Sequence, residues 1–105
     1  MKQADLRVTI AAPGRILVAE PLTFQTARRV CVAGLACFAR DSSALITVDC
    51  AGVTEADSAG LAVLIEWRRW AHKHGRHLRF ENLPAKITAI ARLSEVSELL
   101  ADAAA

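Results

Sequence analysis

Apolar and polar residues alternate at the start of the chain. Residues 6–10 have the period of a half-buried strand. A turn signal at residues 11–14 leads into a second strand over residues 15–19. Because so short a link leaves the two strands side by side, we expect them to pair antiparallel.

Pro21 ends the second predicted strand, and the apolar residues after it have the spacing of a helix. Apolar residues recur every three or four positions over residues 24–39, which predicts a helix there. The hydroxyl of Thr23 or Thr26 is placed to cap it. A loop at residues 41–43 ends this part of the chain.

The second half of the chain alternates strands with helices. Residues 44–49 are a nearly continuous β-prone run, typical of a strand covered on both faces. A helix is predicted over residues 58–74, with Gly75 as the left-handed residue after it, and residues 78–81 are the last predicted strand. An amphipathic helix then carries Ile87, Ile90, Ala91 and Leu93, before a short helical turn with Val96, Leu99 and Leu100.

This order of elements predicts a small α/β domain. Strands joined through helices are parallel with right-handed crossovers, and the first hairpin adds an antiparallel edge to a sheet of about four strands. The 105 residues leave room for one domain. We expect its ordered core over about residues 5–100 and an alanine-rich tail over residues 101–105.

Composition and charge narrow the classes of function. Lys and Arg total 13 and Asp and Glu total 11, and this balance of +2 does not favour nucleic acid or an anionic membrane as the partner. No apolar stretch reaches the roughly 18 residues of a membrane span, and residues 1–5 do not begin a signal peptide. We therefore expect a cytoplasmic protein unless a partner holds it elsewhere.

Residues that usually carry chemistry are scattered. Cys31, Cys37 and Cys50 form no close pair, which favours buried, reduced thiols. No glycine precedes a lysine as in a Walker loop, and no serine lies in a nucleophile elbow. The three histidines between residues 72 and 77 are better explained as cations near a helix C-terminus than as metal ligands. We expect no enzyme activity, cofactor or metal.

The predicted helix over residues 58–74 has an inner face. At about 100° per residue, Gly60 and Trp67 fall on one line, and the missing side chain of Gly60 lets the start of the helix lie close to the sheet. An oxygen of Asp57 or Ser58 is placed to cap this helix.

The outer face of the same helix begins at Ser58. Ala62, Ile65 and Arg69 fall on the same side, so a small and an apolar side chain accompany an exposed hydroxyl. This pattern fits either a capped helix with incidental surface apolar residues or a docking surface for a partner.

Residues 45–61 (LITVDCAGVTEADSAGL) resemble the core signature of STAS domains, the sulphate transporter and anti-sigma factor antagonist family. The centre of that signature is a D-S/T-x-G-L step, here residues 57–61. The order of elements matches as well, so the resemblance covers essentially the whole chain. It implies a small sheet with helices packed on one side.

Two branches of the family compete. Residues 21–24 (PLTF) replace the G-E-L-D usual in sigma-factor regulators, and residues 55–56 (EA) stand where those proteins have two apolar residues. Residues 60–67 and 78–84 are very similar to the STAS subunit of the Mla-type ABC complex, which moves phospholipids between the two membranes of Gram-negative bacteria.

This second branch implies a non-catalytic subunit that regulates or stabilises the cytoplasmic ATPase of the transporter and so helps maintain outer-membrane lipid asymmetry. Through the ATPase it would reach the permease and lie peripheral to the inner membrane without inserting into it. The other branch implies an anti-sigma factor antagonist whose Ser58 is phosphorylated by a partner kinase. The partner-binding residues implied on the second helix are Ser58, Leu61, Ala62, Ile65 and Arg69.

Overall fold

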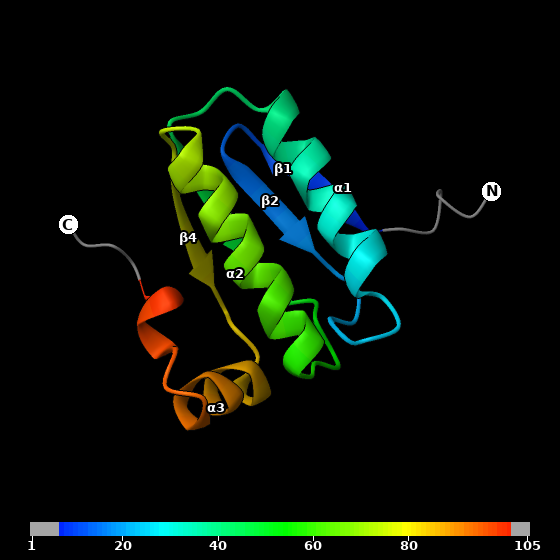
Figure 1. The fold of residues 1–105 in the computed structure, drawn as a ribbon. Coiled ribbons are helices and arrows are strands. Elements are labelled where there is room, and N and C mark those ends of the chain that lie inside the picture. Colours follow the sequence, from blue (N-terminus) through cyan, green and yellow to red (C-terminus); the bar gives the residue numbers. More distant parts are fainter. Residues whose placement is uncertain (1–6, 102–105) are drawn as a thin grey trace.

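Residues 7–101 are described by the structure, a computed structural model. The elements follow the predicted order and end in a short helical turn (Figure 1). Leu6 and the part of the predicted tail at residues 102–105 lie outside the described residues. The elements are β1 (Val8–Ala12), β2 (Arg15–Val18), α1 (Ala27–Arg40), β3 (Leu45–Asp49), α2 (Ser58–Lys73), β4 (His77–Glu81), α3 (Ala85–Leu93) and the 3₁₀ turn η2 (Ser97–Leu99).

The four strands form one sheet in the order β1-β2-β3-β4. β1 pairs antiparallel with β2, whereas β2 with β3 and β3 with β4 are parallel, so the predicted mixed, mostly parallel sheet is confirmed. The first hairpin turns later than predicted, because Ala11 and Ala12 still belong to β1 and Pro13 and Gly14 make the turn. Gly14 has a φ of 78°, a left-handed conformation that costs glycine little.

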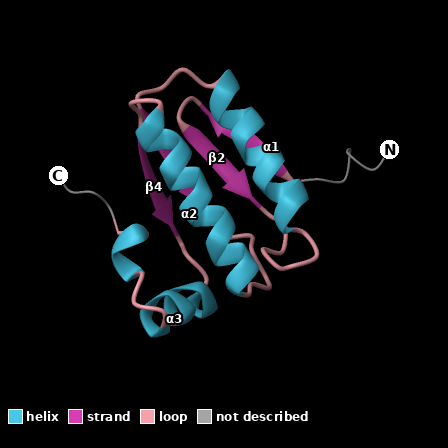
Figure 2. Cartoon of the chain, viewed as in Figure 1, coloured by secondary structure: helices cyan, strands magenta, loops and turns pink. Residues whose placement is uncertain are grey.

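α1 and α2 lie side by side over one face of the sheet, and α3 lies beyond the end of β4 (Figures 1 and 2). Alternate strand residues such as Ile46 and Val48 point into this helix layer and are fully buried. The expectation that residues 44–49 are covered on both faces is wrong for Leu45, which is 44% exposed because no helix within residues 7–101 packs on that side of β3; Thr47, on the same side, is buried. The sheet therefore has one buried face and one open face.

The open face carries a network of ion pairs. One guanidinium nitrogen of Arg15 lies 2.8 Å from the carboxylate of Asp49 and 2.9 Å from that of Glu81. Asp49 also accepts hydrogen bonds from the Asn82 amide and the Ala51 backbone N–H, which lower its pKa. Because Arg15 is on β2, Asp49 on β3 and Glu81 on β4, the network joins three strands.

A glycine brings α1 and α2 into close contact. Trp67 of α2 is fully buried, and its indole N–H donates to the carbonyl of Cys31 on α1 at 3.1 Å. A Cβ at Gly34 would lie 2.3 Å from the Trp67 ring, so no larger residue fits there without a shift. Phe38 completes the contact edge-to-face, with ring centroids 5.5 Å apart.

The start of α1 differs from the prediction in its first residue and in its cap. The helix begins at Ala27, and Thr26 occupies the cap position without a side-chain bond to the helix. Its hydroxyl accepts from the Thr23 N–H and donates to the carbonyl of Pro21 instead. Thr26 therefore closes the preceding turn, and α1 begins three residues later than the apolar spacing predicts.

Arg76, just before β4, holds the far end of the helix layer. Its guanidinium donates to the carbonyls of Phe38, Asp41 and Ser43 at 2.6–2.9 Å. The buried carboxylate of Asp41 in turn accepts from the N–H groups of Gly14 and Ser43, each at 2.7 Å, and these bonds lower its pKa. The loop predicted at residues 41–43 is thus fixed to both the hairpin and β4.

Candidate protein-interaction site

The start of α2 is fixed by the carboxylate of Asp57. One oxygen accepts from the N–H groups of Ala59 and Gly60 at 2.8 and 3.3 Å, satisfying two of the unpaired donors of the first turn. The other oxygen accepts from the Phe24 N–H at 3.0 Å. The bond from Phe24, with those from Ala59 and Gly60, lowers the pKa of Asp57, so the cap is ionised at neutral pH.

The loop before α1 is joined to the loop before α2 by backbone hydrogen bonds. Leu22 and Ala56 form a parallel bridge, in which the Leu22 N–H donates to Glu55 at 2.8 Å and the Asp57 N–H donates to Leu22 at 3.0 Å. A Cβ at Gly60 would lie only 2.1 Å from the Leu22 carbonyl oxygen. Gly60 is therefore buried on the inner face of α2, as its spacing predicts, but its close neighbour is this loop segment and not the sheet.

Ser58 is the first residue of α2 and is exposed. The sequence left the cap open between Asp57 and Ser58, and the structure assigns it to Asp57 alone. The expectation of Ser58 as a capping residue is therefore corrected: an extended backbone at Asp57 turns that side chain back over the first turn. The Ser58 hydroxyl is left on the surface next to the positive end of the helix dipole.

The proposed partner face of α2 is partly assembled. Ala62 and Arg69 are exposed on the same side as Ser58, and Ile65 is half-buried at the margin. Leu61 is only 5% exposed, so its place at the edge of this face is wrong. Leu61 lies on the same side of α2 as Arg68, seven residues later, and Arg68 bonds to the carbonyls of residues 100 and 101.

Phe24 is a surface residue that the sequence pattern did not single out. Its side chain is 80% exposed, while its backbone N–H is held by Asp57 at the start of α2. The predicted helix over residues 24–39 begins at Phe24 but assigns its side chain to no face. The signal that could have identified it is Pro21, which places the following residues in a turn before the helix begins.

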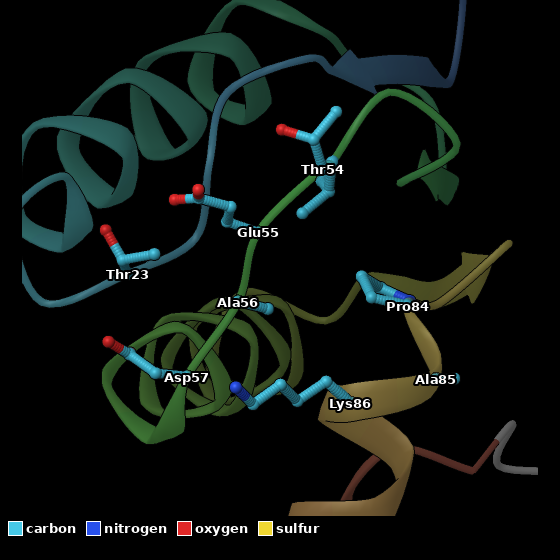
Figure 3. Close-up of a pocket in the computed structure, with 9 residues that line it drawn as sticks. Thr23, Thr54, Glu55, Ala56, Asp57, Pro84, Ala85 and Lys86 are labelled. Atoms are coloured by element: carbon cyan, nitrogen blue, oxygen red, sulfur yellow. The ribbon is translucent and has the colours of Figure 1, made fainter.

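Asp57 also lines a shallow pocket of about 640 Å³. It is bounded by Thr23, by the loop before α2 and by the first turn of α3 (Figure 3). The Lys86 side chain extends from α3 toward Asp57, and its positive charge contributes to the lowered pKa of that carboxyl (Figure 3). The pocket lining holds two acidic side chains, Glu55 and Asp57, and one basic side chain, Lys86.

The three cysteines are unpaired thiols, and His74 is packed against an aromatic ring. All three cysteines are free, and burial together with the nearby charge of Asp49 raises the pKa of Cys50 to about 12. His74 stacks on Trp70 with ring centroids 4.1 Å apart. Within residues 7–101, no three His, Cys, Asp or Glu side chains are grouped as metal ligands.

A single sheet with two parallel crossovers, helices on one face and a capped α2 defines a small α/β domain with one helix-covered face. The family model described as Mlab, STAS domain matches residues 9–101, so the chain belongs to that family. No curated protein matches the chain. Among the described residues, no helix is both long and apolar enough to cross a membrane.

Proposed function

We propose that this protein is a non-catalytic cytoplasmic subunit that binds the ATPase of an Mla-type ABC phospholipid transporter and regulates or stabilises it. The observation that carries this proposal is the match to the family described as Mlab, STAS domain over residues 9–101. Through the ATPase, the subunit would sit beside the permease at the inner membrane and support outer-membrane lipid asymmetry.

The outer face of α2 is the proposed contact with the ATPase. Ser58 and Ala62 are small and exposed, so a partner backbone can approach the helix closely, and Ile65 and Arg69 add apolar area and a charge at the rim. Because the hydrogen-bonded loops hold the start of α2 in place, little conformational freedom is lost on binding. Regulation then follows from a higher affinity for one conformational state of the ATPase than for the other.

Binding to the purified Mla-type ATPase of the same organism tests this proposal. Ala62→Glu places an unpaired charge at the centre of the proposed contact and should weaken binding by roughly a hundredfold. The matched control is Ala89→Glu, because Ala89 is equally an exposed helical alanine but lies on α3. Circular dichroism verifies that both variants fold.

The proposal fails if the unaltered chain does not bind the ATPase, or if Ala62→Glu binds as tightly as Ala89→Glu. Ser58→Asp gives a second measurement at the same face. An acidic residue suits the first turn of a helix, so the fold should be retained while affinity for the ATPase falls.

The exposed Ser58 hydroxyl favours a second candidate function, an anti-sigma factor antagonist. The side chain of Asp57, not that of Ser58, caps the helix, and Ser58 is exposed, so a kinase can reach it. Incubation with the serine kinase of a sigma-regulating system and ATP, followed by mass spectrometry, would then show phosphate on Ser58. The neighbouring genes separate the two candidates: an ABC ATPase and a permease support the first, and such a kinase supports the second.

A further inference from the structure

A second exposed ridge runs along α1. Four residues of α1 at four-residue intervals lie along its outer side, and Phe24, four residues before the first of them, is exposed in the turn that precedes the helix. Phe24 is 80% exposed and Val32 is 61% exposed, although both are large apolar residues. The α1 ridge consists of Phe24, Arg28, Val32, Ala36 and Arg40, all of them exposed.

The charge of this part of the molecule is one-sided. No acidic residue occurs between Pro21 and Arg40. Among the described residues, Arg28 and Arg40 have no ion-pair partner, and Arg29 has only a 3.7 Å contact with Glu20. α1 and α2 together hold six basic residues and one acidic residue, so the helix layer is strongly positive although the whole chain is only +2.

We propose that the α1 ridge binds an acidic amphipathic helix of a partner protein. This surface is separate from the contact proposed on α2, so the inference does not depend on the transporter assignment. The partner helix would place apolar side chains against Phe24 and Val32 and carboxylates beside Arg28 and Arg40.

The geometry of the ridge favours a helix as the occupant. Residues four apart on α1 recur at about 6 Å along the axis, and the i, i+4 rows of a second helix have the same repeat. The small Ala36 leaves room for close approach of a partner. An exposed aromatic residue and arginine forks, which bind carboxylates with two hydrogen bonds, are the side chains enriched in the strongly binding parts of interfaces.

Two other occupants fit less well. A second copy of the chain would place arginines against arginines, and like charges repel. An anionic membrane surface usually attracts clusters of about 4–8 basic residues, whereas the six of the helix layer are divided between two helices and the ridge holds two of them, with a single aromatic residue.

A pair of synthetic peptides tests the proposal. One is a helical peptide with leucine at every fourth position and glutamate beside each leucine; the other has lysine in place of every glutamate. Each is titrated into the ¹⁵N-labelled chain, with amide shifts read by NMR. The glutamate peptide should bind, shift the amides of residues 24–40 and dissociate as salt is added, because salt screens exposed charges. The lysine peptide should not bind.

Variants locate the contact. Arg28→Glu should weaken binding of the glutamate peptide by roughly tenfold or more. Arg92→Glu changes the net charge equally at an exposed site on α3 and should leave binding unchanged. Phe24→Ala leaves the net charge unaltered and should also weaken binding of the glutamate peptide. Such a loss would show that the apolar contact contributes to binding in addition to electrostatic attraction.

Several results would overturn the proposal. These are equal binding of the two peptides, shifts confined to α2 or to the open sheet face, no binding at all, or equal losses in Arg28→Glu and Arg92→Glu. A membrane would be the occupant instead if the chain did not bind the glutamate peptide but sedimented with phosphatidylglycerol vesicles. That sedimentation should then be lost in Arg28→Glu.

Discussion

A single carboxylate organises the start of α2. Asp57 accepts from three backbone N–H groups, two in its own helix and one in the turn that precedes α1. Neighbouring Ser58 contributes none of these bonds, although serine is as good a capping residue in general. The difference separates the two residues by role: Asp57 supports the fold, whereas Ser58 is exposed and takes no part in the cap.

Substitution of these two residues should therefore have unequal effects. Asp57→Ala removes the cap and the bond to Phe24, and we expect the Tm to fall by roughly 4–8 °C, as for the loss of a typical helix cap in a domain of this size. Ser58→Ala should shift the Tm by no more than a degree or two, as expected for an exposed residue. Thermal melts followed by circular dichroism measure both. A larger loss in Ser58→Ala than in Asp57→Ala would contradict the assignment of the cap.

Two helices depend on glycines at their closest contacts. Gly34 admits the ring of Trp67 between α1 and α2, and Gly60 admits the backbone of Leu22 against the first turn of α2. Both contacts join segments distant in sequence, so the missing side chains set how closely these elements approach.

Alanine at either glycine should be destabilising. Overpacking at Gly34→Ala or Gly60→Ala should cost roughly 1–3 kcal/mol of unfolding free energy. Helix propensity alone predicts the opposite sign, because alanine is favoured over glycine by about 1 kcal/mol. Urea unfolding measures the difference, with Ala62→Ser, exposed on α2, as a control expected to stay within about 0.5 kcal/mol. Greater stability in either alanine variant would show that the contact is looser than the geometry indicates.

The whole molecule should be sensitive to acid. Asp41, Asp49 and Asp57 all have a pKa below the ordinary value of 3.8, because each carboxylate accepts hydrogen bonds in the folded state. A group whose pKa is lowered by folding stabilises the protein fully above its unfolded pKa. That contribution is lost as the pH falls through the lower folded value.

We therefore expect the unfolding free energy to fall steeply between about pH 5 and about pH 2. Asp41→Asn should be less stable at pH 7 and show a shallower fall, since its side chain no longer titrates. Glu98→Gln, at an exposed position of η2, is the control and should follow the unaltered chain. Urea titrations at several pH values make the comparison, and parallel curves for Asp41→Asn and the unaltered chain would refute the expectation.

Local periodicity was sufficient to predict much of this architecture. The alternation in residues 6–10, the helical spacing after residue 58 and the turn at Gly14 depend on neighbours close in sequence, so the order of elements and the parallel pairing could be inferred. The inner face of α2, with Gly60 and Trp67, followed from the same periodicity.

The errors arise where distant segments meet. Asp57 could not be distinguished from Ser58 because one of its bonds comes from Phe24, 33 residues earlier. Leu61 was placed at an exposed edge because nothing in the spacing of α2 indicates that the segments after β4 pack against this helix, as α3 does. The close contact at Gly34 likewise depends on a ring from the other helix.

The burial of Trp67 has a practical consequence. Its indole ring has no exposed surface, and its N–H is held by a carbonyl of α1, so its fluorescence should be blue-shifted in the native chain. If α1 moves away from α2, water reaches the indole and the emission shifts to the red. In a Trp70→Phe variant, in which Trp67 is the remaining tryptophan, this emission reports without a label whether the contact between the two central helices is closed.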